Sequence, residues 1–238
     1  MYTRISRNPP SYPAPAIVLV HGLAVSSRYM LPTAVRLASS YAVYVPDLPG
    51  FGRSEKPAHI LNVRELAETL IAWMQAVGLP SATFLGNSLG CQVIVNAALC
   101  YPERVQRTIL VGPTMDPQAR TIQRAGVRLL RDGFCEPIHF LPVLVREYSR
   151  AGMRRTIGTL QYAFADQMEQ HLPHVHAPTL VVRGSRDPIV SQQWVEQVNR
   201  LLPNSQLAVV QGAGHAVNYN SPEQLAQITR RFLSDLSR

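Results

Sequence analysis

The chain has 238 residues, a length that suits one domain or one domain with an insertion. Hydrophobic residues make up 46% of the sequence and charged residues 16%, which excludes general disorder, and no apolar run approaches the roughly 20 residues that a membrane-spanning helix needs. The net charge of +8 is not accompanied by a basic stripe or a nucleic-acid-binding motif, so we expect no nucleic-acid partner.

The amino terminus and the cysteines indicate the compartment. Residues 1–15 lack the apolar core of a signal peptide, so the expected location is the cytoplasm. The three cysteines are odd in number and contain no Cys-x-x-Cys pair. Cys91, Cys100 and Cys135 are therefore expected to be reduced thiols rather than parts of a disulfide framework or a zinc ribbon.

Six short apolar runs along the chain predict strands. Each is four or five residues long and almost continuously hydrophobic, as in parallel strands buried on both faces. The runs are Ala16–Val20, Ala42–Val45, Ala82–Leu85, Thr108–Val111, Thr179–Val182 and Leu207–Val210. Among the intervening segments, Asn62–Val77 has the clearest helical pattern, with Asn62 as its cap and Gly78 as its stop. The alternation of strands and helices predicts an α/β fold with a doubly wound, mainly parallel sheet of six to seven strands. Residues Met1–Ser6 are expected to supply one edge strand at best.

The interval between the fourth and fifth of these strands is unusually long. Residues 113–177 contain helical stretches but no strand-like run, so we expect a helical lid inserted into a core formed by residues 1–112 and 178–238. Arginines recur in this interval at helical spacing. They are Arg120, Arg124, Arg128 and Arg131, and then Arg146, Arg150 and Arg154. A solvated helix face is the favoured explanation, and contact with an anionic substrate or a phospholipid surface is the alternative.

A glycine-flanked serine follows the third predicted strand. Gly86-Asn87-Ser88-Leu89-Gly90 lies between the strand Ala82–Leu85 and a helical run, Cys91–Leu99. This is the G-x-S-x-G nucleophile elbow in the strand–turn–helix context that it requires. We therefore interpret Ser88 as a nucleophile, the alternative being an ordinary serine in a glycine turn.

A serine nucleophile needs a base and an acid that orients the base. Asp187 follows the strand Thr179–Val182, and His215 follows the strand Leu207–Val210. Because the carboxyl ends of parallel strands meet at one edge of a sheet, these side chains are expected to converge on Ser88. Asp116, which also follows a strand, is the alternative acid.

Several segments together resemble the α/β-hydrolase-fold serine hydrolases, and the resemblance covers nearly the whole chain except the insertion. The matching segments are His21-Gly22-Leu23, Pro46 to Ser54, the elbow at Ser88, Asp187 with its neighbours, and Gly212-Ala213-Gly214-His215. The resemblance implies a Ser88–His215–Asp187 triad and an oxyanion hole made by the backbone N–H groups of Leu23 and Leu89. It implies no cofactor and no metal.

The resulting hypothesis is a carboxylesterase-like enzyme that cleaves a small or medium carboxylic ester or related acyl compound through an acyl-enzyme. Its expected substrate contacts are Phe134, Phe140, Tyr148, Ile189 and Val217. A lyase or perhydrolase using the same triad, and a non-catalytic ligand receptor, remain alternatives. Carbon–carbon bond hydrolases of aromatic degradation are a further alternative, disfavoured because they carry a glycine-rich run where this chain has Leu23-Ala24-Val25 and a tryptophan where it has Ala216.

Other polar residues receive structural interpretations. Asp47 opens a Pro-Gly loop and is expected to be a turn or capping residue. His21 is expected to make structural hydrogen bonds, as the resemblance implies. His171, His174 and His176 cluster in sequence, but two prolines interrupt any helix there, so a structural or solvated role is favoured over a zinc site.

Overall fold

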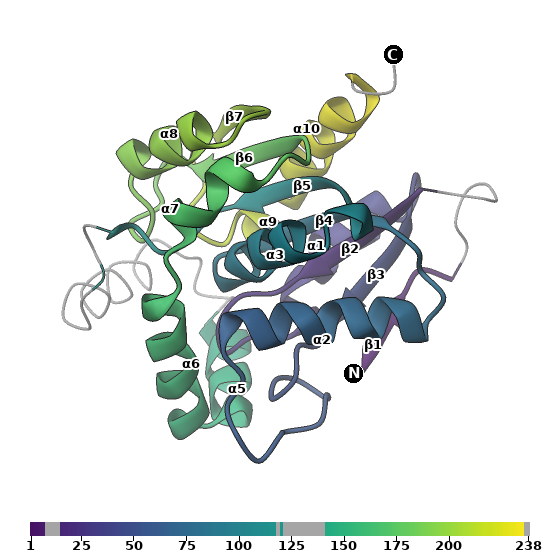
Figure 1. Cartoon of the computed structure of the whole chain (residues 1–238), viewed down its shortest axis with the longest axis vertical. Coiled ribbons are helices and arrows are strands. Elements are labelled where there is room, and N and C mark those ends of the chain that lie inside the picture. Colours follow the sequence, from purple (N-terminus) through teal and green to yellow (C-terminus); the bar gives the residue numbers. More distant parts are fainter. Residues whose placement is uncertain (8–14, 118–119, 121–140, 236–238) are drawn as a thin grey trace.

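Seven strands form one sheet in the order β1-β3-β2-β4-β5-β6-β7 (Figure 1). The computed structural model describes residues 1–7, 15–117, 120 and 141–235. Every neighbouring pair of strands is parallel except β1 and β3. The strands are β1 (Thr3–Ile5), β2 (Ala16–Val20), β3 (Ala42–Pro46), β4 (Ala82–Asn87), β5 (Val105–Val111), β6 (Thr179–Gly184) and β7 (Ser205–Val210). The predicted doubly wound sheet is confirmed, and Met1–Ser6 supplies its one antiparallel edge strand.

Helices cover both faces of this sheet. They are α1 (Ser27–Leu37), α2 (Val63–Ala76), α3 (Leu89–Cys100), α5 (Leu141–Ala151), α6 (Met153–Ala165), α7 (Met168–His171), α8 (Gln192–Leu201), α9 (Val217–Asn220) and α10 (Pro222–Asp235), with 3-10 turns at Pro102–Arg104 and Leu172–His174. In β2, Val18 and Val20 join the cluster formed with α2, α3 and α8, whereas Ile17 and Leu19 join the cluster formed with α1, α9 and α10. This alternation explains why the strand runs are hydrophobic throughout: both faces are buried.

Helix α2 has the boundaries that its sequence predicts. The Asn62 side chain accepts a hydrogen bond from the Glu65 N–H at 2.9 Å, and the Glu65 carboxylate accepts one from the Asn62 N–H at 2.7 Å. This reciprocal capping box satisfies two backbone donors that the first turn leaves without partners. After the helix, Gly78 takes a φ of +70°, a left-handed conformation that favours glycine.

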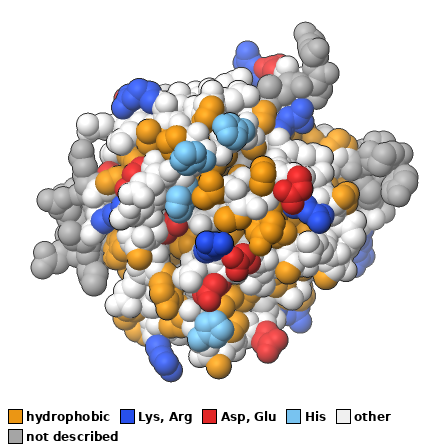
Figure 2. Space-filling model, viewed as in Figure 1, with side chains coloured by type: hydrophobic (Ala, Val, Ile, Leu, Met, Phe, Trp, Pro, Cys, Tyr) orange, Lys and Arg blue, Asp and Glu red, His pale blue; other side chains and the backbone are white. Residues whose placement is uncertain are grey.

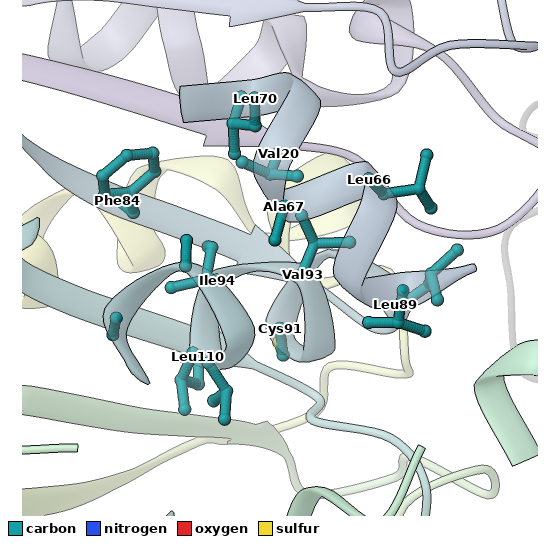
Figure 3. Packing of buried hydrophobic residues seen from close by; sticks show 14 of the residues in the cluster. Val20, Leu66, Ala67, Leu70, Phe84, Leu89, Cys91, Val93, Ile94 and Leu110 are labelled. Atoms are coloured by element: carbon teal, nitrogen blue, oxygen red, sulfur yellow. The ribbon is translucent and has the colours of Figure 1, made fainter. Parts of the chain in front are cut away.

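Helix α3, which begins at the elbow, packs against both α2 and the strands within one buried hydrophobic cluster (Figure 3). Leu66, Ala67 and Leu70 of α2 pack on this side of the sheet with Val93 and Ile94 of α3. The approach of α3 to the sheet is close. A Cβ on Gly90 would lie only 2.4 Å from the carbonyl oxygen of Val20 and 2.9 Å from that of His21. A side chain at this position therefore requires the helix or the strand to move.

We expect Gly90→Ala to lower the free energy of unfolding by about 1–3 kcal/mol, because the new methyl group meets backbone and no flexible side chain can yield. Gly212→Ala is the matched control. Gly212 has a φ of +78° but nothing lies within 4 Å of its Cβ position, so this change adds backbone strain of about 1 kcal/mol without a clash. Urea denaturation of both variants measures the difference, and equal losses would contradict the packing argument.

The described part of the segment between β5 and β6 consists of helices α5, α6 and α7, short 3-10 turns and connecting residues without regular structure, such as residues 113–116, and it contacts the core at several points. Lys56 Nζ donates to the Arg150 carbonyl at 2.6 Å, Arg155 donates to the Pro57 carbonyl at 2.8 Å, and Gln92 Nε2 in α3 donates to the Ala163 carbonyl at 2.9 Å. Figure 1 shows α5 and α6 side by side next to one end of α2. That the insertion acts as a lid stays a prediction.

The arginine pattern of the insertion needs a correction. Arg146 and Arg150 lie in α5 and Arg154 lies in α6, and the two helices are separated by Gly152 at φ +82°. These three residues therefore do not form one helical stripe. Of the first set, Arg120 pairs with Glu169, with one contact at 2.8 Å, and the other three arginines lie outside the described residues. No helix in the described ranges is long and apolar enough to cross a membrane.

Candidate active site

Ser88 occupies a strained turn between β4 and α3. Its backbone has φ 56° and ψ −121°, a combination that is costly for any residue with a side chain. Its N–H donates to the Val111 carbonyl at 3.0 Å, and its side chain makes no capping hydrogen bond to α3. The Cβ position of Gly22 lies 3.3 Å from Ser88 Cβ, so the chain after β2 passes closely over the serine. Ser88 is half-buried.

Asp187 and His215 are brought together from the ends of β6 and β7. His215 Nδ1 and Asp187 Oδ2 are 2.8 Å apart, and both residues are buried. The other carboxylate oxygen, Oδ1, accepts hydrogen bonds from the N–H groups of Ile189 at 2.8 Å and Val190 at 2.9 Å. Burial acts to raise the pKa of Asp187, but the His215 charge and these hydrogen bonds outweigh it and lower the pKa overall. Asp187 is therefore an ionised acceptor that fixes the Nδ1–H form of His215.

Two contacts connect the serine turn with this pair. Asn87 Nδ2 donates to the carbonyl oxygens of Val111 at 3.2 Å and His215 at 3.3 Å. Gly112, with φ +54°, has its Cβ position 2.9 Å from His215 Cε1 and 3.3 Å from Asp187 Oδ2. Any side chain on Gly112 would thus collide with the imidazole. The residues at the carboxyl ends of β4, β5, β6 and β7 form one compact site.

The alternative acid has a different partner. Asp116, beyond β5, accepts a hydrogen bond at its Oδ2 from the Ser191 hydroxyl at 3.1 Å. Ser191 is also the cap of α8, since its hydroxyl accepts from the Trp194 N–H. Asp116 thus connects the start of the insertion with the start of α8, whereas Asp187 is the carboxylate that accepts the hydrogen bond from His215 Nδ1–H.

Of the two residues whose N–H groups are expected in the oxyanion hole, Leu89 directly follows Ser88, and Leu23 directly follows Gly22, whose Cβ position lies 3.3 Å from Ser88 Cβ. Leu89 is the first residue of α3, and N–H groups in the first turn of a helix have no intrahelical acceptor. The helix dipole adds partial positive charge at the same point. Leu23 lies in the turn after β2, immediately before Ala24, whose φ is 56°. The use of these two N–H groups as an oxyanion hole stays a prediction.

His21 and Asp47 have the structural roles expected of them. The fully buried His21 ring contacts the Gly22 carbonyl at 2.8 Å through Nδ1 and accepts at Nε2 from the Leu48 N–H at 2.9 Å. Asp47 accepts from the N–H groups of Ser27 at 2.6 Å and Arg53 at 2.8 Å, and so holds the loop after β3 against the start of α1. Burial lowers the pKa of His21, which keeps the ring neutral.

This pKa shift predicts an acid-sensitive core. The folded-state pKa of His21 lies below its unfolded value of about 6.5, so its contribution is complete above pH 6.5 and is lost as the pH falls from there towards the folded pKa. We expect the free energy of unfolding to decrease by up to about 1.4 kcal/mol per pH unit in this range. Urea denaturation from pH 7.5 to 5 measures the slope, and His21→Gln should flatten it. An unchanged slope in the variant contradicts the assignment.

The five residues expected to contact substrate have different positions. Phe134 and Phe140 lie outside the described residues. Tyr148, on α5, is 38% exposed, and Ile189 is half-buried beside Asp187. Val217 is fully buried in the hydrophobic cluster around α1 and α10, which gives its side chain a packing role. Contact of these residues with substrate stays a prediction.

Sequence reasoning missed the residues that hold the acid loop and the elbow in place. The buried Arg183 at the end of β6 donates to the carbonyls of Val190 at 2.7 Å, Asp187 at 2.9 Å and Ser185 at 3.2 Å. Its guanidinium thereby fixes the loop that carries Asp187. Asn87 was visible only as the variable second position of the elbow motif. An arginine closing a strand carries no sequence signal of this kind, because its acceptors are backbone carbonyls.

No metal centre is formed within the parts of the chain that the structure describes. Figure 2 shows histidine side chains gathered on one face of the molecule, but no group of three or more potential ligands is close enough to hold an ion there. His171 Nδ1 lies 3.8 Å from the carboxylate of Asp166, which also accepts from Gln92 at 2.8 Å and Asn96 at 3.0 Å. Cys91 and Cys100 are free thiols.

Comparison with known proteins agrees with this architecture. The model of the alpha/beta hydrolase family matches residues 17–228. The chain belongs to the alpha/beta hydrolase family. Among relatives of this alpha/beta hydrolase, carboxylesterase YbfK of Bacillus subtilis (strain 168) is 27% identical over 243 residues, covering 92% of this chain and 80% of the relative. A protein provisionally named carbamate hydrolase RutD, from Pseudomonas syringae pv. syringae (strain B728a), is 28% identical over 248 residues, covering 93% and 94%.

Solved structures show the same alpha/beta hydrolase fold. The enol-lactonase from Burkholderia xenovorans LB400 superposes with a TM-score of 0.81 at 20% identity, covering 98% of this chain and 96% of that one. A thermophilic esterase from Thermogutta terrifontis superposes with a TM-score of 0.78 at 22% identity, covering 98% and 93%. At these identities the structures support the fold alone.

Proposed function

We propose that this alpha/beta hydrolase is a serine esterase that cleaves a small or medium carboxylic ester or related acyl compound. The observation that carries the proposal is the placement of a serine on a strained strand-to-helix turn beside a buried, hydrogen-bonded Asp187–His215 pair. A strained backbone at a polar residue is typical of functional sites. The kinship with carboxylesterase YbfK supports the same reaction class.

The chemistry divides into two acyl transfers. Ser88 Oγ attacks the substrate carbonyl carbon while His215 Nε2 takes the serine proton. Asp187 accepts the hydrogen bond from Nδ1–H and stabilises the imidazolium. The N–H groups of Leu23 and Leu89 receive the developing oxyanion. The imidazolium then protonates the departing alcohol, leaving an acyl-enzyme, and a water activated by the same histidine releases the acid and restores Ser88.

A second candidate substrate class is the carbamates. The relative RutD is named as a carbamate hydrolase, and the same triad can attack a carbamate carbonyl. A carbamoyl-serine would form in place of the acyl-serine. Turnover of a phenyl ester and its carbamate counterpart by the same sample separates the two classes.

Labelling with a fluorophosphonate tests the nucleophile directly. The reagent phosphonylates an activated serine, so peptide mapping should place the adduct on Ser88 alone, with parallel loss of ester hydrolysis. Ser185, whose hydroxyl accepts from the Gly212 N–H at 2.8 Å, serves as an internal control because it is not expected to react. An adduct on another serine, or unlabelled protein that hydrolyses esters at full rate, overturns the proposal.

A further inference from the structure

A groove of about 640 Å³ lies between α1 and α5. Its lining is partly apolar, from residues such as Val35 and Val143, and partly charged, from Arg28, Arg146 and Glu147. Because α5 belongs to the insertion and α1 to the core, the groove lies at the boundary between them.

Glu147 is the unusual member of this lining. Its side chain is only 3% exposed, and among the described residues its Oε1 has no hydrogen-bond partner. A buried carboxylate oxygen without a donor is energetically costly, because desolvation is not repaid. The charge of Glu147 also reaches the buried ring of His21, which places it on the inner side of α5. The residue therefore has unused capacity to accept a hydrogen bond from a bound molecule.

The surrounding charges favour an anion as well. Arg36 is engaged by Glu223 at 3.0 Å and by the Pro32 carbonyl at 2.8 Å. Arg28 and Arg146 have no ion-pair partner in the described part of the chain, and both line the groove. Guanidinium groups are well suited to carboxylate ligands. Because Arg28, Arg146 and the buried carboxylate of Glu147 all line the groove, it presents both cationic and acceptor groups.

The groove is connected to the elbow through two stacked rings. Tyr219 lines the groove and stacks on Tyr29, with ring centroids 6.1 Å apart. The Tyr29 hydroxyl donates to Asn87 Oδ1 at 3.0 Å, and Asn87 is the residue before Ser88. The rings of Tyr219 and Tyr29 therefore lie between the groove and the serine turn.

From these contacts we propose that the groove is a binding site for a small organic carboxylate that also bears an O–H or N–H donor. Arg28 and Arg146 pair with the carboxylate, and Glu147 accepts the hydrogen bond from the donor. This inference goes beyond the proposed esterase function, and the binding site does not depend on the reactivity of Ser88.

The test compares two probes that are not esters, butyrate and 4-hydroxybutyrate, by calorimetry on the full chain. The wild type should bind 4-hydroxybutyrate more tightly than butyrate. Glu147→Gln should weaken 4-hydroxybutyrate binding by about tenfold, the effect of one hydrogen bond to a charged group. The same change should strengthen butyrate binding, because it removes a negative charge facing the anion. A purely structural role for Glu147 does not produce opposite effects on the two probes.

Arg146→Gln completes the set and should weaken both probes by about tenfold. The exposed pair Glu196→Gln and Arg200→Gln, both on α8, are matched controls that should leave binding unchanged. Equal effects of Glu147→Gln on both probes, or no binding by the wild type, overturn the proposed site.

Discussion

Ser88→Ala is expected to lower kcat for a short-chain ester by several orders of magnitude, on the scale of about 10⁶-fold seen when a serine nucleophile is removed from a triad. The large effect follows because triad residues act as a unit, so His215 without a hydroxyl to activate contributes little. Alanine keeps the Cβ and so the steric demands at φ 56°, and the turn should retain its shape. Steady-state kinetics with 4-nitrophenyl acetate provide the measurement.

The control for this experiment is Ser81→Ala, which removes an exposed hydroxyl that accepts from Gln106 at 2.8 Å, away from the site. Its turnover should equal that of the wild type. Ser88→Ala should also unfold at a urea concentration close to the wild-type value, which separates lost chemistry from lost structure. A purified Ser88→Ala sample with near-normal turnover would falsify the nucleophile assignment.

Asp187→Asn is expected to reduce turnover by about 10⁴-fold, the cost of the corresponding change in the worked serine-protease triad. The asparagine oxygen can still accept from the Ile189 and Val190 N–H groups, so the loop should keep its conformation. Its amide then faces His215 Nδ1 as a donor. This favours the imidazole tautomer with its proton on Nε2, which cannot accept the serine proton.

Asp116→Asn is the matched comparison, because it makes the same chemical change at the other candidate acid. Asparagine can still accept from the Ser191 hydroxyl, so we expect turnover within a few-fold of the wild type. Parallel kinetics and urea denaturation of the two variants decide between the acids. If Asp116→Asn abolishes turnover and Asp187→Asn is mild, the triad has been assigned to the wrong carboxylate.

Arg183 also contributes to the proposed active site, because it positions the loop that carries Asp187. Its three hydrogen bonds to backbone carbonyls hold the loop that carries Asp187 in place. It is a positioning residue, since its guanidinium donates to the backbone carbonyls of this loop. The orientation of the Asp187 carboxylate therefore depends on a cation that neither the elbow motif nor the order of the triad reveals.

The sequence determined the strand–helix alternation, the sheet type and the identity of the candidate residues. Local patterns sufficed for these features: apolar runs of four or five residues predict buried strands, Asn62 with Glu65 predicts a helix start, and glycines around Ser88 predict a sharp turn. The predicted strand cores agree with β2 to β7, with differences of a few residues at the ends because end residues are polar.

Only the tertiary structure decided which distant residues meet. Asp116 and Asp187 both follow strands, and the hydrogen bond from His215 selects Asp187 through the pairing of β6 with β7. The break at Gly152 between α5 and α6 and the burial of Glu147 likewise depend on how the insertion packs on the core. Such contacts join side chains far apart in sequence, and their geometry is set by packing and burial of the whole domain, which no local pattern encodes.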